Sequence, residues 1–553
     1  MKKLYVLLAA ASFMIVTGCG SSSEAPLSPA KAITAFKITS PVEATGVITE
    51  AAHTIAITVP YATNTAHLVA TFTTTGASVK VNSTVQESGN TANDFTNSTI
   101  NPVIYTVTAA DASTQDYKVT VTVSPRSGSL DTTFGESGKV VTSIGSGNSQ
   151  ALALGIQSGG KIVAAGRSFN STGNKNDFAL VRYNAGGSLD TGFGTGGTGI
   201  VTTSIGSSND QANALGIQYN GTPDFKIVVA GSSYNSNSSK FDFALVRYNA
   251  NGTLDTGFGT GGTGIVTTSI GNSYDYANAL GIQPDGRIVV AGRSFNSNSN
   301  KYDFALVRYN ANGTLDTTFG TNGKVTTSIG SGSVYDYAYA LGIQPVGMSD
   351  VKIVVAGYSS NGSKYNFALV MYNTDGSLDT GFGAALTGIV TTSIGSSYDA
   401  AHALGIQSDG TSDFKIVVAG SSANGSKYNF ALVRYNKDGS LDTTFGNNGI
   451  VTTPIGSNFD AAYALGIQPA DGSIVAAGYS GNGSNYDFAL VKYNTNGSLD
   501  TGFGAGGIVT TPIGNDDDKA FALGIQPADG RIVVAGYSLI GSNDDFALVR
   551  YLP

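Results

Sequence analysis

A sevenfold internal repeat is the feature of this sequence that most narrows the folds open to it. The leucine of a motif typified by SLDTTFG recurs at Leu130, Leu189, Leu254, Leu315, Leu378, Leu441 and Leu499. The phenylalanine of a second motif, typified by FALVRY, recurs at Phe178, Phe243, Phe304, Phe367, Phe430, Phe488 and Phe546. Successive copies lie roughly 60 residues apart, and repetition at such a period indicates stacked structural units that share a continuous core.

Each repeat holds four short apolar segments and shows no helical periodicity. In the third repeat these are ALGIQ (279–283), RIVVAG (287–292), FALVRY (304–309) and KVTTSI (324–329). The tight-turn sequence PDG joins the first two segments, and a longer turn that begins NANG follows the third. Four strands per unit, repeated seven times without a helix, predict an all-β fold: a seven-bladed β-propeller of four-stranded blades.

The composition of the strands favours blades over a solenoid, which is the alternative repeat architecture. RIVVAG and FALV are apolar at nearly every position, as expected of middle strands whose two faces are both covered by neighbouring blades. A solenoid needs atypical capping repeats at its ends, whereas the first and last repeats here resemble the others. We therefore expect a closed ring.

The phase of the repeats predicts how the ring closes. A KVTTSI-like segment, KVVTSI (139–144), precedes the first complete repeat, whereas the last repeat supplies three strands between residues 522 and 551. An open ring would leave two unpaired strand edges. We expect the N-terminal segment to become the outer strand of the last blade, with Val140 close to Leu548.

The motifs GSLDTTFG, ALGIQPDGRIVVAG and YDFALVRYN resemble the delta-60 repeat of bacterial surface proteins over residues 128–553. The order of strands and turns is also similar to the NHL-type propeller blade, in which the innermost strand precedes a DG hairpin. The resemblance implies a propeller over 127–553 with ALGIQ innermost and KVTTSI outermost in each blade. It also implies that the loops around the mouth of the central channel bind partners.

The N-terminus carries the layout of an export signal. Lys2 and Lys3 precede an apolar run (4–16) that is too short to span a bilayer as a mature helix. The sequence VTGC, which ends at Cys19, resembles the lipobox of bacterial lipoproteins. The resemblance implies a signal peptide at 1–18, a lipid anchor to the membrane on Cys19, and a place in the outer membrane or on the cell surface of a Gram-negative bacterium. The alternative is an ordinary secreted protein.

Two further regions separate this signal from the repeats. Residues 19–31 have the composition of a flexible tether. Residues 32–124 hold six strand-like runs, and in the last of them apolar positions from Tyr117 to Val123 alternate with polar ones, which predicts a half-buried strand. Six short strands predict a small β-sandwich. The region resembles the Ig-like and cadherin-like modules of bacterial surface lipoproteins, which implies a spacer.

Strand order places the turns of the repeats on two faces of the propeller. The PDG and LDTTFG turns are nearly identical in every repeat. The connections after VVAG and before ALGIQ vary and are rich in Tyr, Asn, Ser and Asp, residues that suit adaptable recognition. Tyrosines in these connections could stack on sugar rings: Tyr234, Tyr274, Tyr335 and Tyr398.

Candidate ligand-binding residues form a ring at the channel mouth. One set is the aspartate that precedes the Ala-x-Ala opening of six inner strands: Asp210, Asp275, Asp336, Asp399, Asp460 and Asp518. The middle position of Ala-x-Ala adds Tyr339, His402 and Tyr463. Carboxylates around a channel could attract cations or polyhydroxyl ligands. An aspartate in this place can also cap a turn through backbone amides, and both interpretations stay open.

The net charge and the residue types of the chain limit the functions that it can have. The net charge of -8 argues against a nucleic-acid partner, which needs a basic face. His402 is the only histidine of the repeats and no cysteine lies among them, so no metal-ligand set or catalytic triad is evident. The spacing of acidic residues that forms an EF-hand is absent, so no motif supports Ca2+ binding. We expect no cofactor.

We therefore expect no enzyme, but a surface-tethered binding or scaffold module. Its variable loops would face an extracellular or periplasmic protein, peptide or glycan. Two alternatives remain. One is a structural component of the cell envelope, and the other is a carbohydrate-active enzyme, a glycoside-acting hydrolase or lyase that uses paired aspartates as acid and base.

Overall fold

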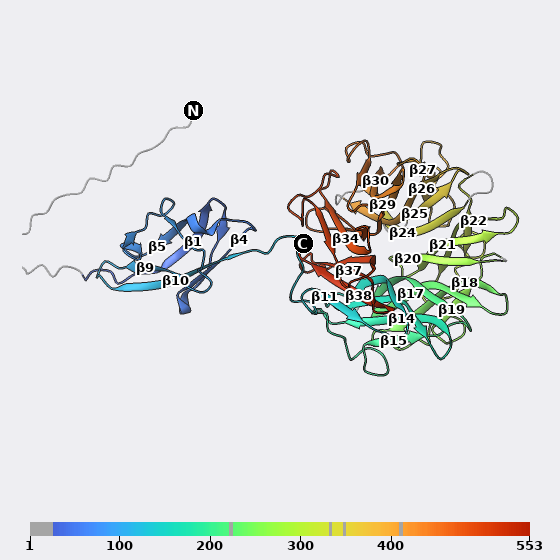
Figure 1. Ribbon diagram of the computed structural model, residues 1–553, viewed down its shortest axis with the longest axis horizontal. Helices are drawn as coiled ribbons and strands as arrows, with labels where there is room; N and C mark the ends of the chain where they lie inside the picture. Colours follow the sequence, from blue (N-terminus) through green and yellow to red (C-terminus); the bar gives the residue numbers. More distant parts are fainter. Residues whose placement is uncertain (1–25, 220–224, 272, 331–334, 347–349, 409–412) are drawn as a thin grey trace, which may run out of the picture. The chain divides into compact units, whose positions relative to one another are not determined.

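The computed structural model describes residues 26–219, 225–271, 273–330, 335–346, 350–408 and 413–553. The expected signal peptide and Cys19 lie outside the described residues. Contacts within the chain divide it into two compact units, Met1–Pro125 and Arg126–Pro553, which are taken in turn below (Figure 1). Within the described ranges, no helix is long and apolar enough to cross a membrane.

The first unit contains two β-sheets with a shared core. One sheet has the order β2 (Ala44–Thr45), β1 (Ile33–Ser40), β5 (Leu68–Thr74) and β8 (Ala92–Asn93). The other has the order β3 (Val47–Thr49), β4 (Thr54–Val59), β10 (Thr114–Val123), β9 (Val103–Thr108), β6 (Ser78–Val81) and β7 (Thr84–Val85). Two 3-10 turns, η1 (Glu50–Ala52) and η2 (Thr65–His67), lie between strands. β10 is parallel to β4 and antiparallel to β9, so this sheet is mixed.

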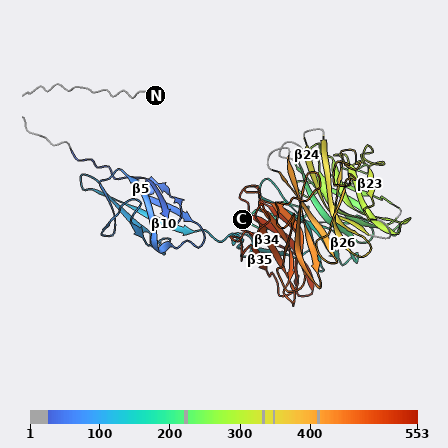
Figure 2. The same ribbon diagram turned by 90° about the horizontal axis from the view of Figure 1, so that it is seen from above.

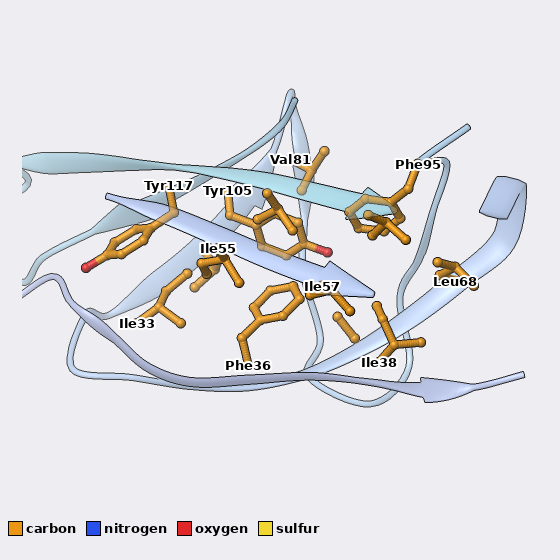
Figure 3. Packing of buried hydrophobic residues seen from close by; sticks show 14 of the residues in the cluster. Ile33, Phe36, Ile38, Ile55, Ile57, Leu68, Val81, Phe95, Tyr105 and Tyr117 are labelled. Carbon is orange, nitrogen blue, oxygen red and sulfur yellow. The ribbon is translucent and has the colours of Figure 1, made fainter. Parts of the chain in front are cut away.

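The core of this unit lies between its two sheets and follows the period-two pattern of the strands (Figure 3). Phe36 of β1 meets Tyr105 of β9 edge to face, with ring centroids 5.1 Å apart. Along β10 the apolar positions from Tyr117 to Val121 are buried, as predicted. Val123 is 38% exposed, contrary to the prediction, because it is the last residue of the strand and lies beyond the end of the core.

The described part of the second unit forms seven four-stranded antiparallel sheets, the blades, numbered here from the first inner strand. The inner strands are β12 (Ser149–Ile156), β16 (Asp210–Tyr219), β20 (Asp275–Ile282), β24 (Asp336–Val346), β28 (Asp399–Ser408), β32 (Asp460–Ile467) and β36 (Asp518–Ile525). The second strands are β13 (Ile162–Asn170), β17 (Phe225–Asn235), β21 (Ile288–Asn296), β25 (Asp350–Ser360), β29 (Phe414–Asn424), β33 (Ile474–Gly481) and β37 (Ile532–Ile540).

The outer half of each blade consists of a long third strand and a short fourth strand. The third strands are β14 (Lys175–Tyr183), β18 (Lys240–Asn249), β22 (Lys301–Tyr309), β26 (Tyr365–Tyr372), β30 (Lys427–Asn436), β34 (Tyr486–Tyr493) and β38 (Asn543–Tyr551). The outer strands are β15 (Ile200–Thr203), β19 (Ile265–Thr268), β23 (Lys324–Thr327), β27 (Ile389–Thr392), β31 (Ile450–Thr453), β35 (Ile508–Thr511) and, in blade 7, β11 (Lys139–Thr142).

Neighbouring blades stack face to face around a centre (Figures 1 and 2). In Figure 1 the inner strands β20 and β24 lie nearer the centre than the outer strands β19 and β27. Each blade interface is a hydrophobic cluster shared by two blades; in one of them Val289 and Ala291 of β21 pack with Ile353 and Val355 of β25. Both faces of the middle strands are therefore buried. The predicted seven-bladed β-propeller is confirmed.

The ring closes where the sequence predicted. β11 pairs with β38 in antiparallel register, which places Val140 opposite Leu548. The segment before β11 continues this seam, because the Gly128 amide donates to the Leu552 carbonyl at 2.9 Å. Asp131 accepts from Arg550 Nε at 2.8 Å, and both side chains are buried. Strand pairing and a buried ion pair thus join the two ends of the repeated region.

The arginine of FALVRY has a structural role that ties adjacent blades together. Arg308 Nε lies 2.8 Å from Asp316 Oδ2 of the LDTTFG turn. Its guanidinium also lies over the Phe319 ring and donates to the Thr374 carbonyl of the next blade. Equivalent ion pairs occur at Arg182–Asp190, Arg247–Asp255, Arg434–Asp442, Arg550–Asp131 and Lys492–Asp500. These cations are therefore engaged within the protein.

Candidate functional site

Strand order gives the propeller two unlike faces. The repeated-turn face carries the hairpins between inner and second strands and the LDTTFG turns between third and outer strands. The variable face carries the connections between second and third strands, and those from each outer strand to the next inner strand; in blade 1 these are 171–174 and 204–209. Inner strands begin and second strands end at the variable face, so the candidate residues gather there.

The six candidate aspartates are buried in the turns that lead into the inner strands. Asp336 is fully buried, accepts from the Ile329 amide at 2.8 Å, and accepts from Ser359 Oγ at 2.6 Å. The corresponding isoleucine amide donates to each of the others: Asp210, Asp275, Asp399, Asp460 and Asp518. These contacts match the turn-capping alternative. The carboxylates do not line the channel, and we do not propose them as ligand contacts.

Burial also changes the acidity of these carboxyl groups. It raises the pKa of Asp336 above its ordinary value, while hydrogen bonds from Ser359 and the turn amides act in the opposite direction. The pKa is raised in the same way at Asp210, Asp275 and Asp518. A buried carboxyl group that accepts hydrogen bonds from the turn amides and a serine is suited to holding a turn.

Each inner strand carries a β-bulge at its Ala-x-Ala segment. In blade 4 the register against β25 slips by one residue between Ala338 and Ala340, so Tyr339 has no partner residue on that strand. The bulged residues of all blades are Leu152, Asn213, Asn278, Tyr339, His402, Tyr463 and Phe521. A bulge re-aims its side chain. In blades 2 to 7 the bulged side chain contacts a neighbouring inner strand.

These seven side chains form what we call the channel ring. His402 stacks on Tyr463 with centroids 4.4 Å apart and meets Tyr339 edge to face at 5.1 Å. On the other side of the ring, Asn213 and Asn278 each donate to a carbonyl of the next inner strand at 2.8 Å. The three residues that the sequence singled out are thus brought together, within a ring that is aromatic over blades 4 to 7.

His402 is neutral at physiological pH. It is half-buried, and its Nδ1 is enclosed without a hydrogen-bond partner among the described residues. Burial lowers the pKa of His402 to about 4. The neutral imidazole thus packs between two tyrosines, stacked on Tyr463 and edge to face with Tyr339.

A continuous run of aromatic rings lies on the variable face from blade 3 to blade 6. We call it the aromatic belt; it consists of Tyr274, Tyr276, Tyr302, Tyr335, Tyr337, Tyr358, Tyr365, Tyr398, Tyr428, Phe459, Tyr479 and Tyr486. Tyr274 and Tyr335 are each 39% exposed, whereas most of the others are half-buried beside them. Tyr339 stacks on Tyr358 at 5.6 Å, which connects the belt to the channel ring.

Of the four tyrosines named from the sequence as sugar-stacking candidates, three lie within the aromatic belt and one lies beside it. Tyr274, Tyr335 and Tyr398 belong to the aromatic belt. Tyr234 is half-buried next to it and reaches it through Phe241, whose ring lies 5.2 Å from both Tyr234 and Tyr276. The structure therefore brings all four into one aromatic surface.

A hollow outside the aromatic belt lies on the other face of the propeller. It has a volume of about 590 Å³, lies between blades 5 and 6 on the repeated-turn face and is lined by Gln407, Arg434 and Asp471, among others. Its arginine is already paired with Asp442. Across the described ranges, no three His, Cys, Asp or Glu side chains gather closely enough to hold a metal ion.

Sequence reasoning missed the bulge, although a signal for it was present. Every second strand carries glycine directly opposite the bulge, at Gly292 in blade 3. A Cβ at Gly292 would collide with the carbonyl oxygen of Tyr276, so the close approach of the bulged strand requires glycine. The recurrent glycine of VVAG therefore marked the bulge, and with it the residues that line the channel.

Comparison with known families finds similarity in both units. Residues 33–121 match the family model described as "SGBP, N-terminal". Seven segments match the model described as "Domain of unknown function (DUF5122) beta-propeller": 157–193, 222–258, 283–319, 349–382, 407–445, 470–503 and 528–553. These matches fit a propeller with an N-terminal module. A comparison with curated proteins gives no significant match.

Two solved structures show low similarity to this chain. Sqt1 from Chaetomium thermophilum is 12% identical, with 71% of this chain and 80% of that chain covered and a TM-score of 0.36. Drosophila Plexin A, in complex with Semaphorin 1b, is 9% identical over 73% of this chain and 87% of that chain, with a TM-score of 0.33. Likeness at this level carries no argument about function.

Proposed function

We propose that this chain is a surface glycan-binding protein, in which the aromatic belt of the propeller holds the sugar. The similarity of residues 33–121 to an SGBP N-terminal domain supports a cell-surface role and a glycan partner, because the abbreviation denotes surface glycan-binding proteins. A lipid on Cys19 would tether the chain to the outer membrane. The observation that carries the proposal is the aromatic belt itself.

The belt has the chemistry that sugar recognition requires. Pyranose rings present flat C–H faces, and tyrosine offers a rigid apolar ring with a polar tip at low cost in conformational entropy. Tyr274 and Tyr335 are exposed enough to receive a sugar face, whereas Tyr276 and Tyr337 support them from below at centroid distances of 6.5 and 6.0 Å. The neighbouring Asn and Ser side chains of the variable connections supply donors and acceptors for hydroxyl groups.

We propose binding without catalysis. A glycoside-acting enzyme needs two carboxyl groups that flank the scissile bond. The six carboxylates nearest the channel are buried in their turns, where backbone amides hold them. The belt itself presents phenols, which suit stacking and hydrogen bonding better than proton transfer at neutral pH.

The proposal is tested with the full chain on a glycan array, followed by calorimetric titration of the glycan that binds. We expect the double variant Tyr274→Ala and Tyr335→Ala to lose about tenfold or more in affinity, since two stacking surfaces are removed. Tyr219→Ala is the matched control, because Tyr219 is 56% exposed at the end of β16 on the repeated-turn face. An array on which no glycan binds, or equal affinity in the double variant, would contradict the proposal.

A further inference from the structure

One cation on the variable face has no acidic partner among the described residues. Arg293, a residue of β21, packs against three rings of the aromatic belt. Its Cζ lies 4.5 Å from the ring centroid of Tyr276, 4.5 Å from that of Tyr337 and 5.5 Å from that of Tyr302. These tyrosines come from blades 3 and 4, so the guanidinium occupies an aromatic cage where two blades meet.

The hydrogen-bonding capacity of this guanidinium is unused by the described protein. Its Nε is enclosed without a hydrogen-bond partner, and no side-chain hydrogen bond or ion pair of Arg293 occurs within the described residues. The cage cannot neutralise it, because burial raises the pKa of Tyr337 to about 12 against the opposing charge of Arg293, and the phenol stays protonated. The donors of this half-buried charge are therefore open to a partner from outside the chain.

Comparison among the blades shows that the fold does not require this arrangement. Blade 1 also has an arginine at this position, but Arg167 donates to Gln150 Oε1 at 2.8 Å and to Gln211 Oε1 at 2.9 Å. The other blades have serine or tyrosine there: Ser232, Tyr358, Ser421, Tyr479 and Tyr537. This position therefore varies among the blades, and of its two arginines only Arg293 has no hydrogen-bond partner among the described residues.

We propose that Arg293 binds the anionic group of an acidic sugar, so that the glycan recognised by the aromatic belt carries a carboxylate or a sulfate. This inference rests on the proposed function and narrows its substrate class. A guanidinium presents planar N–H donors that match the oxygens of such groups, and it keeps its charge at every physiological pH. The tyrosine rings pack against Arg293 and hold its side chain in place for an incoming anion.

The surroundings place the anion and the sugar ring together. The exposed Tyr274 lies next to Tyr276, and the exposed Tyr335 lies 6.1 Å from Tyr302, so both flank the cage. The turn carboxylate of the same blade, Asp275, is fully buried and accepts from the Ile270 amide at 2.7 Å, which directs it into its own turn. A pyranose stacked on either exposed tyrosine would bring a substituent on its ring toward Arg293.

The experiment compares the full chain with Arg293→Gln, Arg293→Lys and Arg167→Gln by calorimetric titration. The probes are oligogalacturonate, a sulfated heparin-derived oligosaccharide, and neutral cello- and manno-oligosaccharides. We expect the wild type to prefer one of the two anionic probes and to bind it less tightly as salt increases. Arg293→Gln should lose about tenfold or more on that probe. Arg293→Lys should fall between the two, and Arg167→Gln should retain wild-type affinity, with melting temperatures unchanged in all three variants.

Other results would refute either the anionic site alone or glycan binding by the belt as well. Preference for neutral probes, or equal loss in Arg293→Gln and Arg167→Gln, would refute the anionic site and leave glycan binding by the belt in place. Wild-type affinity of Arg293→Gln for the anionic probe would do the same. Binding to none of the probes, together with an empty glycan array, would remove the proposed function as well. Preference between galacturonate and the sulfated probe identifies which anion the site takes.

Discussion

At the scale of single residues, the propeller separates positions that hold the fold from positions free to vary. The buried aspartates, the Arg–Asp pairs and the glycine opposite the bulge recur because each satisfies a fixed backbone or blade contact. The bulged residue pairs with nothing on the second strand, so it can be Leu, Asn, Tyr, His or Phe without breaking the sheet. Variation at this position is what makes the channel ring asymmetric.

The contribution of His402 to folding stability can be tested by its dependence on pH. Its pKa is lowered by burial to about 4, whereas an unfolded histidine titrates near 6.5. The unfolded state therefore binds more protons between these values, and stability present above about pH 6.5 is lost as the pH falls toward 4. We expect His402→Tyr, which copies Tyr339 and Tyr463, to lack this component, on the order of 3 kcal/mol. Denaturant unfolding at pH 7, 5 and 4 measures it, and parallel pH profiles for the two proteins would count against the assignment.

At the scale of elements, the sequence predicted strand type, strand order and closure, but not strand length. Seven copies of one pattern made the apolar segments unambiguous. The second and third strands nevertheless extend several residues into the Asn- and Ser-rich connections; β21 reaches Asn296 rather than Gly292. Backbone pairing between β21 and β22 continues to Asn296, but the sequence there has no apolar pattern from which the strand could be predicted. For the same reason the aromatic cage around Arg293, which depends on residues from two blades, was beyond prediction from sequence.

The seam is the element on which ring closure depends. β11 covers the edge of β38, and the buried pair of Asp131 and Arg550 lies beside it. Deletion of residues 128–145 removes the ladder between β11 and β38 and four further backbone hydrogen bonds to Arg550 and Leu552, at about 0.5–1.5 kcal/mol each. It also leaves Arg550 buried without its acidic partner. We expect aggregation or a fall in melting temperature of more than about 10 °C. Deletion of 33–121, which belongs to the other compact unit, is the control. A melting temperature equal to that of the parent would show that closure does not need this strand.

At the scale of the whole molecule, two units of different kinds share one chain. The first is a small β-sandwich similar to an SGBP N-terminal domain, and the second is a closed propeller whose variable face carries the aromatic belt and Arg293. We propose that the propeller, and not the sandwich, recognises the glycan. This is the central claim, because the roles proposed for Arg293, Tyr274 and Tyr335 all require the sugar to lie on the variable face.

Hydrogen–deuterium exchange of the full chain, with and without a glycan that binds on the array, tests this claim most directly. We predict slower exchange in peptides that contain Tyr274, Tyr335 and Arg293, and unchanged exchange in the hairpins of the repeated-turn face. Protection confined to residues 33–121, or to the repeated-turn face, would contradict it.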